Sequence, residues 1–231
     1  MDIKASRMVE SLMALSLIVP VLNNFKVFAE LMATVDYPVQ PIVLDNWNSN
    51  RGVAGAWNEG MRRSLEIGNQ YALISNDDAS FTPGSIKKMY DFIKYQSNAV
   101  LISPNQNAYD EVEPPRENGA DFFCFLVDIP KLIEKCGWFD ENIYPAYFED
   151  NDMHRRMLLA GAKSYILPNV QVNHVGSATQ NFEPGNPVVP PHMFEANRAY
   201  FIEKWGGNPG SEQYSHPFNN SEKDVSYWEK R

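Results

Sequence analysis

The sequence predicts an α/β fold built on a mixed, mostly parallel central sheet. Two observations lead to this prediction. Short apolar runs alternate with longer amphipathic segments along the chain, which is typical of strands joined by covering helices and not of a bundle or a sandwich. A hydrophobic content of 44% in 231 residues is enough for the sizeable core that one such domain needs.

Six strands are predicted, each an apolar run bounded by polar or turn-forming residues. The apolar stretch 12–22 contains the first of them. It is not interpreted as a signal peptide, because Asp2 and Glu10 spoil the basic flank and no small-residue cleavage site follows. The predicted strands span residues 15–19, 41–44, 71–75, 99–103, 122–127 and 164–167.

Four helices are predicted between and after these strands. Apolar and small residues recur at helical spacing after Gly52, up to Leu65. Thr82 is expected to cap a second helix whose first turn contains Pro83. The other two helices are expected over residues 149–160 and 193–205.

The chain is expected to form one domain over residues 1–205, followed by a polar appendage over residues 206–231. The Gly- and Pro-containing stretch 206–210 marks the boundary. Residues 104–118 have little apolar content and are expected to be a surface loop, either functional or an idle connection.

Composition also restricts the function and the compartment. A formal charge of −9 argues against broad attraction to nucleic acid or anionic membrane. Cys124 and Cys136 are too few for a disulfide scaffold and are interpreted as buried small hydrophobes, which favours a reducing, cytoplasmic location. No run approaches the roughly 18 apolar residues that cross a bilayer, so any membrane association is expected to be peripheral.

Adjacent carboxylates follow the predicted strand 71–75. Asp77 and Asp78 lie where this apolar run ends, directly after Asn76. Two neighbouring carboxylates near a buried strand repel each other and lose hydration unless a cation or hydrogen-bond donors compensate. A divalent cation site is therefore predicted, with a hydrogen-bonded turn as the alternative. His174, near a late strand, is either a ligand of this cation or a structural residue.

A second polar cluster follows the predicted strand 41–44. Asp45 lies at the end of this strand, and the glycine-punctuated segment 50–58 follows it. Such an arrangement can pair with a base or ribose and offer backbone N–H groups to a phosphate. The glycine spacing fits neither a Rossmann nor a P-loop fingerprint, so a turn before a tightly packed helix remains the alternative.

The order of these motifs resembles the nucleotide-sugar glycosyltransferases of the GT-A fold, in particular family 2. Asn76 departs from the family pattern, which has an acidic residue there. The chain between Asp45 and Asn50 is also shorter than in the family, so selectivity for the base is not carried over. The segments that carry the resemblance are LIVPVLN (17–23), IVLDN (42–46), NRGVAGAWN (50–58), ISNDD (74–78), GWFDE (137–141) and YFEDND (147–152), followed by His174.

The resemblance implies a Rossmann-type three-layer sandwich and an inverting, metal-dependent glycosyl transfer. The expected cofactor is Mn²⁺ or Mg²⁺, the expected donor is a UDP-sugar, and the expected acceptor is a glycan or another hydroxyl compound. Asp150 would be the catalytic base. The resemblance assigns donor binding to Pro20, Asp45, Asn50, Gly52, Asn58 and Asp77, acceptor binding to Trp138 and Glu149, and metal binding to Asp78 and His174.

Other functions compete with this one. Without the resemblance, Glu149, Asp150 and Asp152 would be favourable first-turn acids of a helix, and Glu149 and Asp152 are the next candidates for the base. A metal-dependent sugar-phosphate nucleotidyltransferase and a non-catalytic nucleotide-sugar binding module remain alternatives. A modified base in viral DNA is a less favoured acceptor because of the negative charge. His154, Arg155 and Arg156 are expected on the solvated face of their helix.

Overall fold

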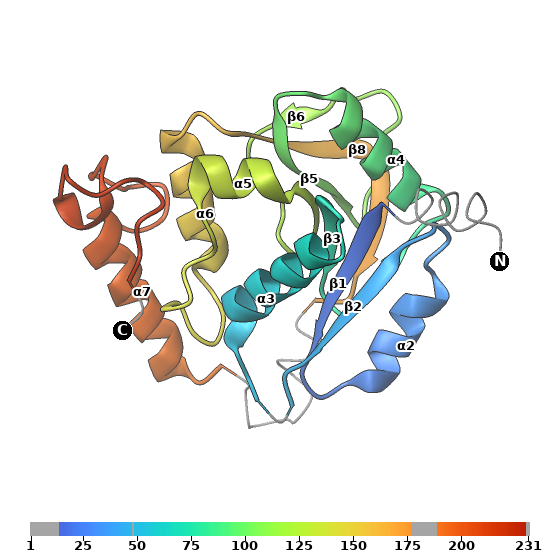
Figure 1. Ribbon diagram of the computed structural model, residues 1–231, viewed down its shortest axis with the longest axis horizontal. Coiled ribbons are helices and arrows are strands. Elements are labelled where there is room, and N and C mark those ends of the chain that lie inside the picture. Colours follow the sequence, from blue (N-terminus) through green and yellow to red (C-terminus); the bar gives the residue numbers. More distant parts are fainter. Residues whose placement is uncertain (1–13, 48, 177–188, 230–231) are drawn as a thin grey trace.

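The computed structural model describes residues 14–47, 49–176 and 189–229, and its centre is one mixed sheet (Figure 1). The strands run in the order β2-β1-β3-β7-β5-β8-β4, and β6 pairs with β8. The two longest ladders, between β1 and β2 and between β5 and β8, are parallel. The strands are β1 (Leu15–Val21), β2 (Gln40–Asp45), β3 (Tyr71–Ser75), β4 (Ala79–Phe81), β5 (Ala99–Gln106), β6 (Arg116–Glu117), β7 (Cys124–Asp128) and β8 (Lys163–His174).

Helices cover both faces of the sheet, which gives three layers (Figure 1). Alternate residues of β1 pack on opposite sides, because side chains of a strand point alternately to its two faces. Ile18 lies in a core with α3, α5 and α6, whereas Leu17 and Val19 lie in a core with α2 and α4. The helices are α2 (Phe25–Ala33), α3 (Gly52–Glu66), α4 (Ser85–Tyr95), α5 (Ile129–Cys136), α6 (Glu149–Leu159) and α7 (Pro191–Trp205), with a short 3₁₀ helix at Pro217–Asn219.

The α/β prediction is confirmed, and all six predicted strands are present. Cys124 and Cys136 are fully buried, as expected. The sequence pattern missed α2, α5, β4 and the extension of β8 to His174. Elements as short as α5 and β4 carry too few residues for a clear periodic signal. The end of β8 is mostly polar in sequence, and its pairing with β4 and β5 decides it.

The predicted Thr82 cap is wrong. Helix α4 begins at Ser85, after Gly84 in the left-handed conformation with φ 76°. The Thr82 hydroxyl instead donates to the carbonyl oxygen of Gln171 at 2.6 Å, which ties the approach to the helix to strand β8. A long-range partner therefore competes successfully with the local cap.

The prediction of solvated residues on α6 is wrong for Arg156. Its guanidinium is fully buried, pairs with Asp152 and donates to the carbonyl oxygen of Cys136 at 2.9 Å. Burial of this guanidinium is offset by the Asp152 carboxylate and by the carbonyl oxygens that accept from NH1, although its Nε has no hydrogen-bond partner among the described residues. Arg155 and His154 remain partly exposed.

The C-terminal segment packs on α7 in the part of the chain that is described. The backbone N–H groups of Gln213 and Tyr214 donate to the carbonyl oxygen of Trp205, both at 3.0 Å. The rings of Tyr200 and Phe218 lie 6.0 Å apart. The division of the chain at residue 205 stays a prediction. The predicted surface loop 104–118 is exposed from residue 106 onward, but residues 104–106 belong to β5, and Arg116–Glu117 forms β6, which pairs with β8. Within the described ranges, every helix is too short or too polar to cross a membrane.

Candidate active site

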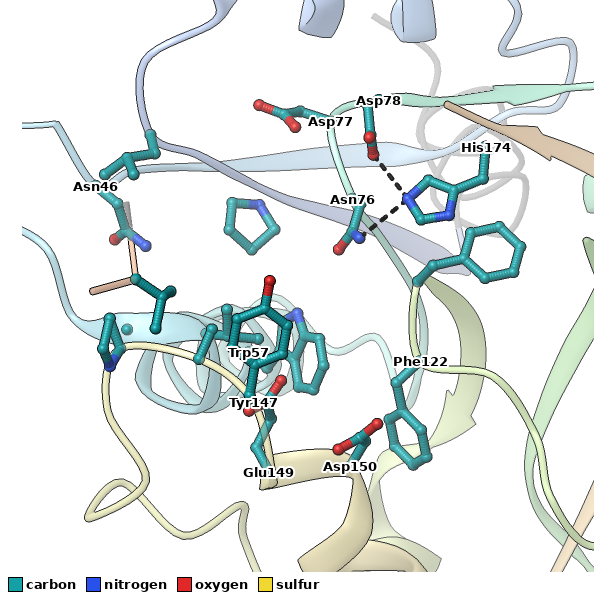
Figure 2. Close-up of a pocket in the computed structure, with 18 of the residues that line it drawn as sticks. Asn46, Trp57, Asn76, Asp77, Asp78, Phe122, Tyr147, Glu149, Asp150 and His174 are labelled. Atoms are coloured by element: carbon teal, nitrogen blue, oxygen red, sulfur yellow. Dashed lines mark hydrogen bonds and ion pairs between the residues drawn. The ribbon is translucent and has the colours of Figure 1, made fainter. Parts of the chain in front are cut away.

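One cavity of about 450 Å³ lies at the carboxyl ends of the parallel strands β1, β2 and β3. In α/β sheets this edge is where ligands bind, because loops and helix N-termini converge there. Figure 2 shows acidic side chains on two sides of this cavity. Asp77 and Asp78, after β3, lie on one side, and Glu149 and Asp150, at the start of α6, lie opposite.

The acidic residues after β3, Asp77 and Asp78, form the first acidic corner of the cavity, and Asp78 pairs there with His174. His174 Nε2 lies 3.0 Å from Asp78 Oδ1, and both side chains are largely buried. Gln106 Nε2 lies 3.0 Å from His174 Nδ1, and the ring of Phe123 stacks on the imidazole with centroids 4.6 Å apart. When the Gln106 amide donates to Nδ1, the imidazole proton is on Nε2 and points at Asp78. The ring is therefore held in one orientation at the cavity wall.

The second acidic corner begins directly after two strained residues. Tyr147 and Phe148 have φ values of 75° and 80°. Residues other than glycine rarely adopt this left-handed backbone conformation, and those that do are often found at functional sites. This turn brings Glu149 and Asp150 to the cavity at the first turn of α6. Figure 2 shows Asp150 beside Phe122 on the side opposite Asp78.

Glu149 is buried beside Asp150, and one of its oxygens, Oε2, has no hydrogen-bond partner in the described protein. Burial, reinforced by the neighbouring Asp150 charge, raises the pKa of Glu149 to about 8. Glu149 is therefore protonated at neutral pH and can donate a hydrogen bond to a ligand. The two adjacent acids of this corner differ in environment.

Asp152 is not part of the cavity. It is fully buried, and Lys204 Nζ lies 2.8 Å from its Oδ1. Burial alone would raise the pKa of Asp152, but Arg156 and Lys204 outweigh that effect and lower the pKa to about 2. This carboxylate is structural, which removes it from the candidates for the catalytic base.

The side of the cavity at the end of β2 contains Asn46 where Asp45 was expected. Asp45 Oδ1 accepts a hydrogen bond from the Trp47 backbone N–H at 2.8 Å and lies outside the cavity lining. Its neighbour Asn46 is buried and lines the cavity, with its side-chain oxygen 3.0 Å from Arg51 NH1. Asp45 is the last residue of β2 and Asn46 follows it. This position at the strand end was the signal in the sequence, but it does not say which of two consecutive side chains faces the cavity.

The architecture has counterparts among solved structures. No protein-family model matches the sequence, and neither does any curated protein. Among solved structures, the catalytic domain of Drosophila β1,4-galactosyltransferase 7, in complex with xylobiose, matches with a TM-score of 0.56 and 14% identity over 80% of this chain and 79% of that one. TarS (residues 1–349) from S. aureus matches with a TM-score of 0.52 and 13% identity over 71% of this chain. This chain spans 60% of the TarS chain.

The fold is GT-A-like. At such low identity the likeness is one of architecture, and the residues of the site are argued from their own positions. Family 2 membership and inversion stay predictions. The GT-A-like sheet brings most of the predicted residues to one cavity. The predicted residues that line it are Pro20, Asn50, Gly52, Asp77, Asp78, Glu149, Asp150 and His174.

Three predicted residues lie outside the lining of this cavity: Asp45, Asn58 and Trp138. Asn58 is fully buried and exchanges hydrogen bonds with the backbone of Phe139, donating at 2.9 Å and accepting at 3.0 Å. It joins α3 to the segment before α6. Trp138 packs against the core, and Arg62 lies 4.8 Å from its ring centroid.

Tyr147 is an aromatic residue of the wall that the sequence analysis did not single out as a site residue. Its side chain is 40% exposed and lines the cavity next to Glu149. The ring packs edge-on against Phe194 of α7, with centroids 5.5 Å apart. The only signal in the sequence was that Tyr147 belongs to the YFEDND segment. Its aromatic character was no guide, because aromatic side chains are found in the core as often as in binding sites.

The residues present fit a divalent cation whose coordination shell is completed by substrate phosphates and water. The described residues contain no cluster of three or more His, Cys, Asp or Glu side chains able to hold a metal. Asp78 and His174 offer two ligands, and Mg²⁺ is usually held by one or two carboxylates together with substrate phosphates and water. For Nε2 to ligate, the imidazole proton has to move to Nδ1, and the Gln106 amide then has to present its oxygen.

Glu149→Gln is expected to make stability less sensitive to pH. The pKa of Glu149 in the folded protein, about 8, lies above its ordinary value of 4.5. The unfolded chain therefore loses this proton first, and the free energy of unfolding falls as pH rises from 4.5 to 8, by up to about 1.4 kcal/mol per pH unit. Gln cannot ionise and should abolish this part of the decline. Urea unfolding at several pH values measures it, and parallel curves for both proteins would contradict the assignment.

Proposed function

We propose that this GT-A-like protein transfers a sugar from a nucleotide-diphosphate-sugar to an acceptor hydroxyl, with inversion and with the help of a divalent cation. The observation that carries the proposal is the pair of acidic corners facing each other across one cavity. One corner suits a cation bound to the leaving diphosphate. The other suits a base that accepts a proton from the attacking hydroxyl.

The charge of the cavity supports the need for a cation. Its described lining contains the carboxyl groups of Asp77, Asp78, Asp121 and Asp150, beside the protonated Glu149, but neither Lys nor Arg. A diphosphate cannot enter a site of carboxylates without compensation, because like charges repel strongly at low dielectric.

The start of α3 offers less to the diphosphate than the sequence predicted. The Gly52 N–H donates to Asn50 Oδ1 at 2.8 Å, and the Val53 N–H donates to the Pro145 carbonyl oxygen at 2.7 Å. These two N–H groups of the helix are already satisfied. This supports a donor site in which Asp78 and His174 hold Mn²⁺ or Mg²⁺, and that ion supplies charge neutralisation to the diphosphate.

Transfer by single displacement needs only one proton acceptor. The acceptor oxygen forms a bond to the anomeric carbon while the bond from that carbon to the diphosphate oxygen breaks. Asp150 accepts the hydroxyl proton, and the nucleoside diphosphate leaves with the electron pair. Glu149, protonated, donates a hydrogen bond to a sugar oxygen. Asn46, Asn50 and Pro20 border the space left for the nucleoside.

A thermal-shift panel of nucleoside diphosphates and their sugars tests the proposal, beginning with UDP-sugars. A ligand that binds only the folded protein raises its apparent melting temperature, so a shift that needs Mn²⁺ is expected. Release of nucleoside diphosphate from the matching sugar donor then shows turnover. Pyrophosphate release from a nucleoside triphosphate and a sugar phosphate would instead identify a nucleotidyltransferase. Binding without any donor hydrolysis would identify a binding module.

Asp78→Asn is expected to leave the fold intact and to weaken Mn²⁺-dependent donor binding by at least about tenfold, because the amide is a much poorer cation ligand than the carboxylate. Isothermal titration with a nucleoside diphosphate, with and without Mn²⁺, measures the effect. Asp91→Asn, on the exposed face of α4, is the matched control and should bind normally. Full activity of the wild-type protein in excess EDTA would end the metal proposal.

A further inference from the structure

Helix α7 presents a row of hydrogen-bonding side chains to the segment 140–152, which forms the acceptor side of the cavity. Asn197, Tyr200, Lys204 and Trp205 occupy one face of α7, at helical spacing, and all four are buried. None of them lines the cavity. We propose that this face of α7 holds Glu149 and Asp150 in position for the reaction, and that Asn197 is its principal positioning residue.

Asn197 holds the middle of the segment through its backbone. Its Oδ1 accepts from the Tyr144 N–H at 3.2 Å. Its Nδ2 donates to the carbonyl oxygens of Ala146, at 2.9 Å, and Tyr147, at 3.3 Å. Only an amide side chain offers an acceptor and two donors from one short stem. These contacts join α7 to two residues that precede the strained turn, Tyr144 and Ala146, and to its first residue, Tyr147.

Lys204 holds both ends of the same segment. Its Nζ lies 2.8 Å from Asp140 Oδ2 and 2.8 Å from Asp152 Oδ1. The Tyr200 hydroxyl donates to Asp140 Oδ2 at 2.7 Å, and Trp205 Nε1 donates to Asp152 Oδ1 at 2.9 Å. One helix therefore fixes the beginning, the middle and the end of the segment.

The segment needs such support because its conformation is intrinsically unfavourable. Tyr147 and Phe148 both have positive φ, and such residues persist only where their surroundings over-determine them. Phe148 also packs on Phe201, and Tyr147 on Phe194, so α7 supplies apolar contacts as well. Loss of the Asn197 contacts should allow the turn to relax and Glu149 and Asp150 to shift. A base displaced by about 1 Å can cost about a hundredfold in rate.

Hydrogen exchange tests the contacts without any substrate. In Asn197→Ala, amides of residues 144–150 should exchange at least about tenfold faster, while those of β1 and β3 keep their wild-type rates. Glu195→Ala, on the exposed side of α7, is the control and should match the wild type throughout. Unchanged exchange at 144–150 in a folded Asn197→Ala protein would overturn the proposal, as would an equal increase over the whole chain.

The expected effect on turnover rests on the proposed glycosyl transfer. A positioning role should change kcat without changing the donor KM. Asn197→Ala should lower kcat by about tenfold to a hundredfold and leave the donor KM unchanged. Asn197→Asp keeps the oxygen that accepts from the Tyr144 N–H, but it places a second oxygen, in place of the donating NH₂ group, next to the carbonyl oxygens of Ala146 and Tyr147. Its kcat relative to wild type should rise as pH falls, because a protonated carboxyl can donate to one of them. A pH-independent ratio, or a rise in donor KM with unchanged kcat, would overturn the positioning role.

The two proposals fail in different ways. If the wild-type protein transfers no sugar from any donor, the proposed function fails, whereas faster exchange at residues 144–150 in Asn197→Ala still supports the role of α7 in holding the segment. If transfer occurs and the Asn197 variants both behave as wild type, glycosyl transfer stands and the positioning role is overturned.

Discussion

Asp150→Asn is expected to lower the rate of sugar transfer by about a hundredfold or more, the usual effect of removing a positioned base. The amide is almost the same size as the carboxylate, so the fold and the acceptor site should persist while the proton acceptor is lost. Donor affinity and its dependence on Mn²⁺ should stay at wild-type values, because Asp78 and His174 lie on the other side of the cavity. Single-turnover kinetics with saturating donor measures the chemical step directly.

Near-normal transfer by Asp150→Asn would exclude Asp150 as the base. Glu149 is then the remaining acid at the start of α6 that faces the cavity, since Asp152 is buried in ion pairs with Arg156 and Lys204. The configuration of the product tests the mechanism independently. A donor with an α linkage should give a β-linked product, visible in the NMR coupling of the anomeric proton for a gluco-configured sugar. Retained configuration would exclude single displacement.

Lys204→Met is expected to reduce the free energy of unfolding by about 3–5 kcal/mol, the usual cost of removing one partner from a buried ion pair. The ammonium and both of its carboxylate partners, Asp140 and Asp152, are fully buried. Methionine fills a similar volume, so the loss reports the carboxylates left without Lys204, above all Asp140, since Asp152 keeps its pair with Arg156, and it does not report a cavity. Equilibrium unfolding in guanidinium chloride measures it.

Lys163→Met is the matched control for this substitution. Lys163 pairs with Glu117 at 2.9 Å, but both side chains are substantially exposed. Exposed pairs of this kind contribute about 0–1 kcal/mol. Equal losses in the two variants would contradict the assignment of the Asp140–Lys204–Asp152 cluster as a buried electrostatic support of the acceptor side.

Local pattern was enough for the central strands of the sheet and for the acidic corner after β3. Strands β1, β3 and β7 are buried on both faces, so their nearly continuous apolar runs are visible in the sequence. Asp77 and Asp78 come directly after β3, and the residues after a parallel strand lie at the ligand-binding edge of the sheet. The helix start at Glu149 was likewise visible from its acids.

The same local information misplaced several charged and polar side chains. Asp45 and Asn46 are adjacent, yet Asp45 accepts a hydrogen bond from the Trp47 N–H, whereas Asn46 lines the cavity. A position at the end of a strand can be inferred from the sequence, but the direction of each side chain depends on the turn after the strand. Asn58 had the position of a donor ligand and instead joins α3 to Phe139, 81 residues away.

The α/β architecture and the carboxylates after β3 could be inferred from local pattern, because hydrophobic period is a property of neighbouring residues. The assignment of the acids at the start of α6 to a site came from the resemblance of the motif order, since helix-start chemistry alone explains them as first-turn acids. The three-dimensional arrangement was needed to distinguish the acids that face the cavity from those that support the fold. Asp150 and Asp152 lie on the same first turn of α6, but Lys204, 52 residues beyond Asp152 in the chain, pairs with only one of them. The environment of a carboxylate is set by the charges and burial around it in space, and those come from segments that no local pattern connects.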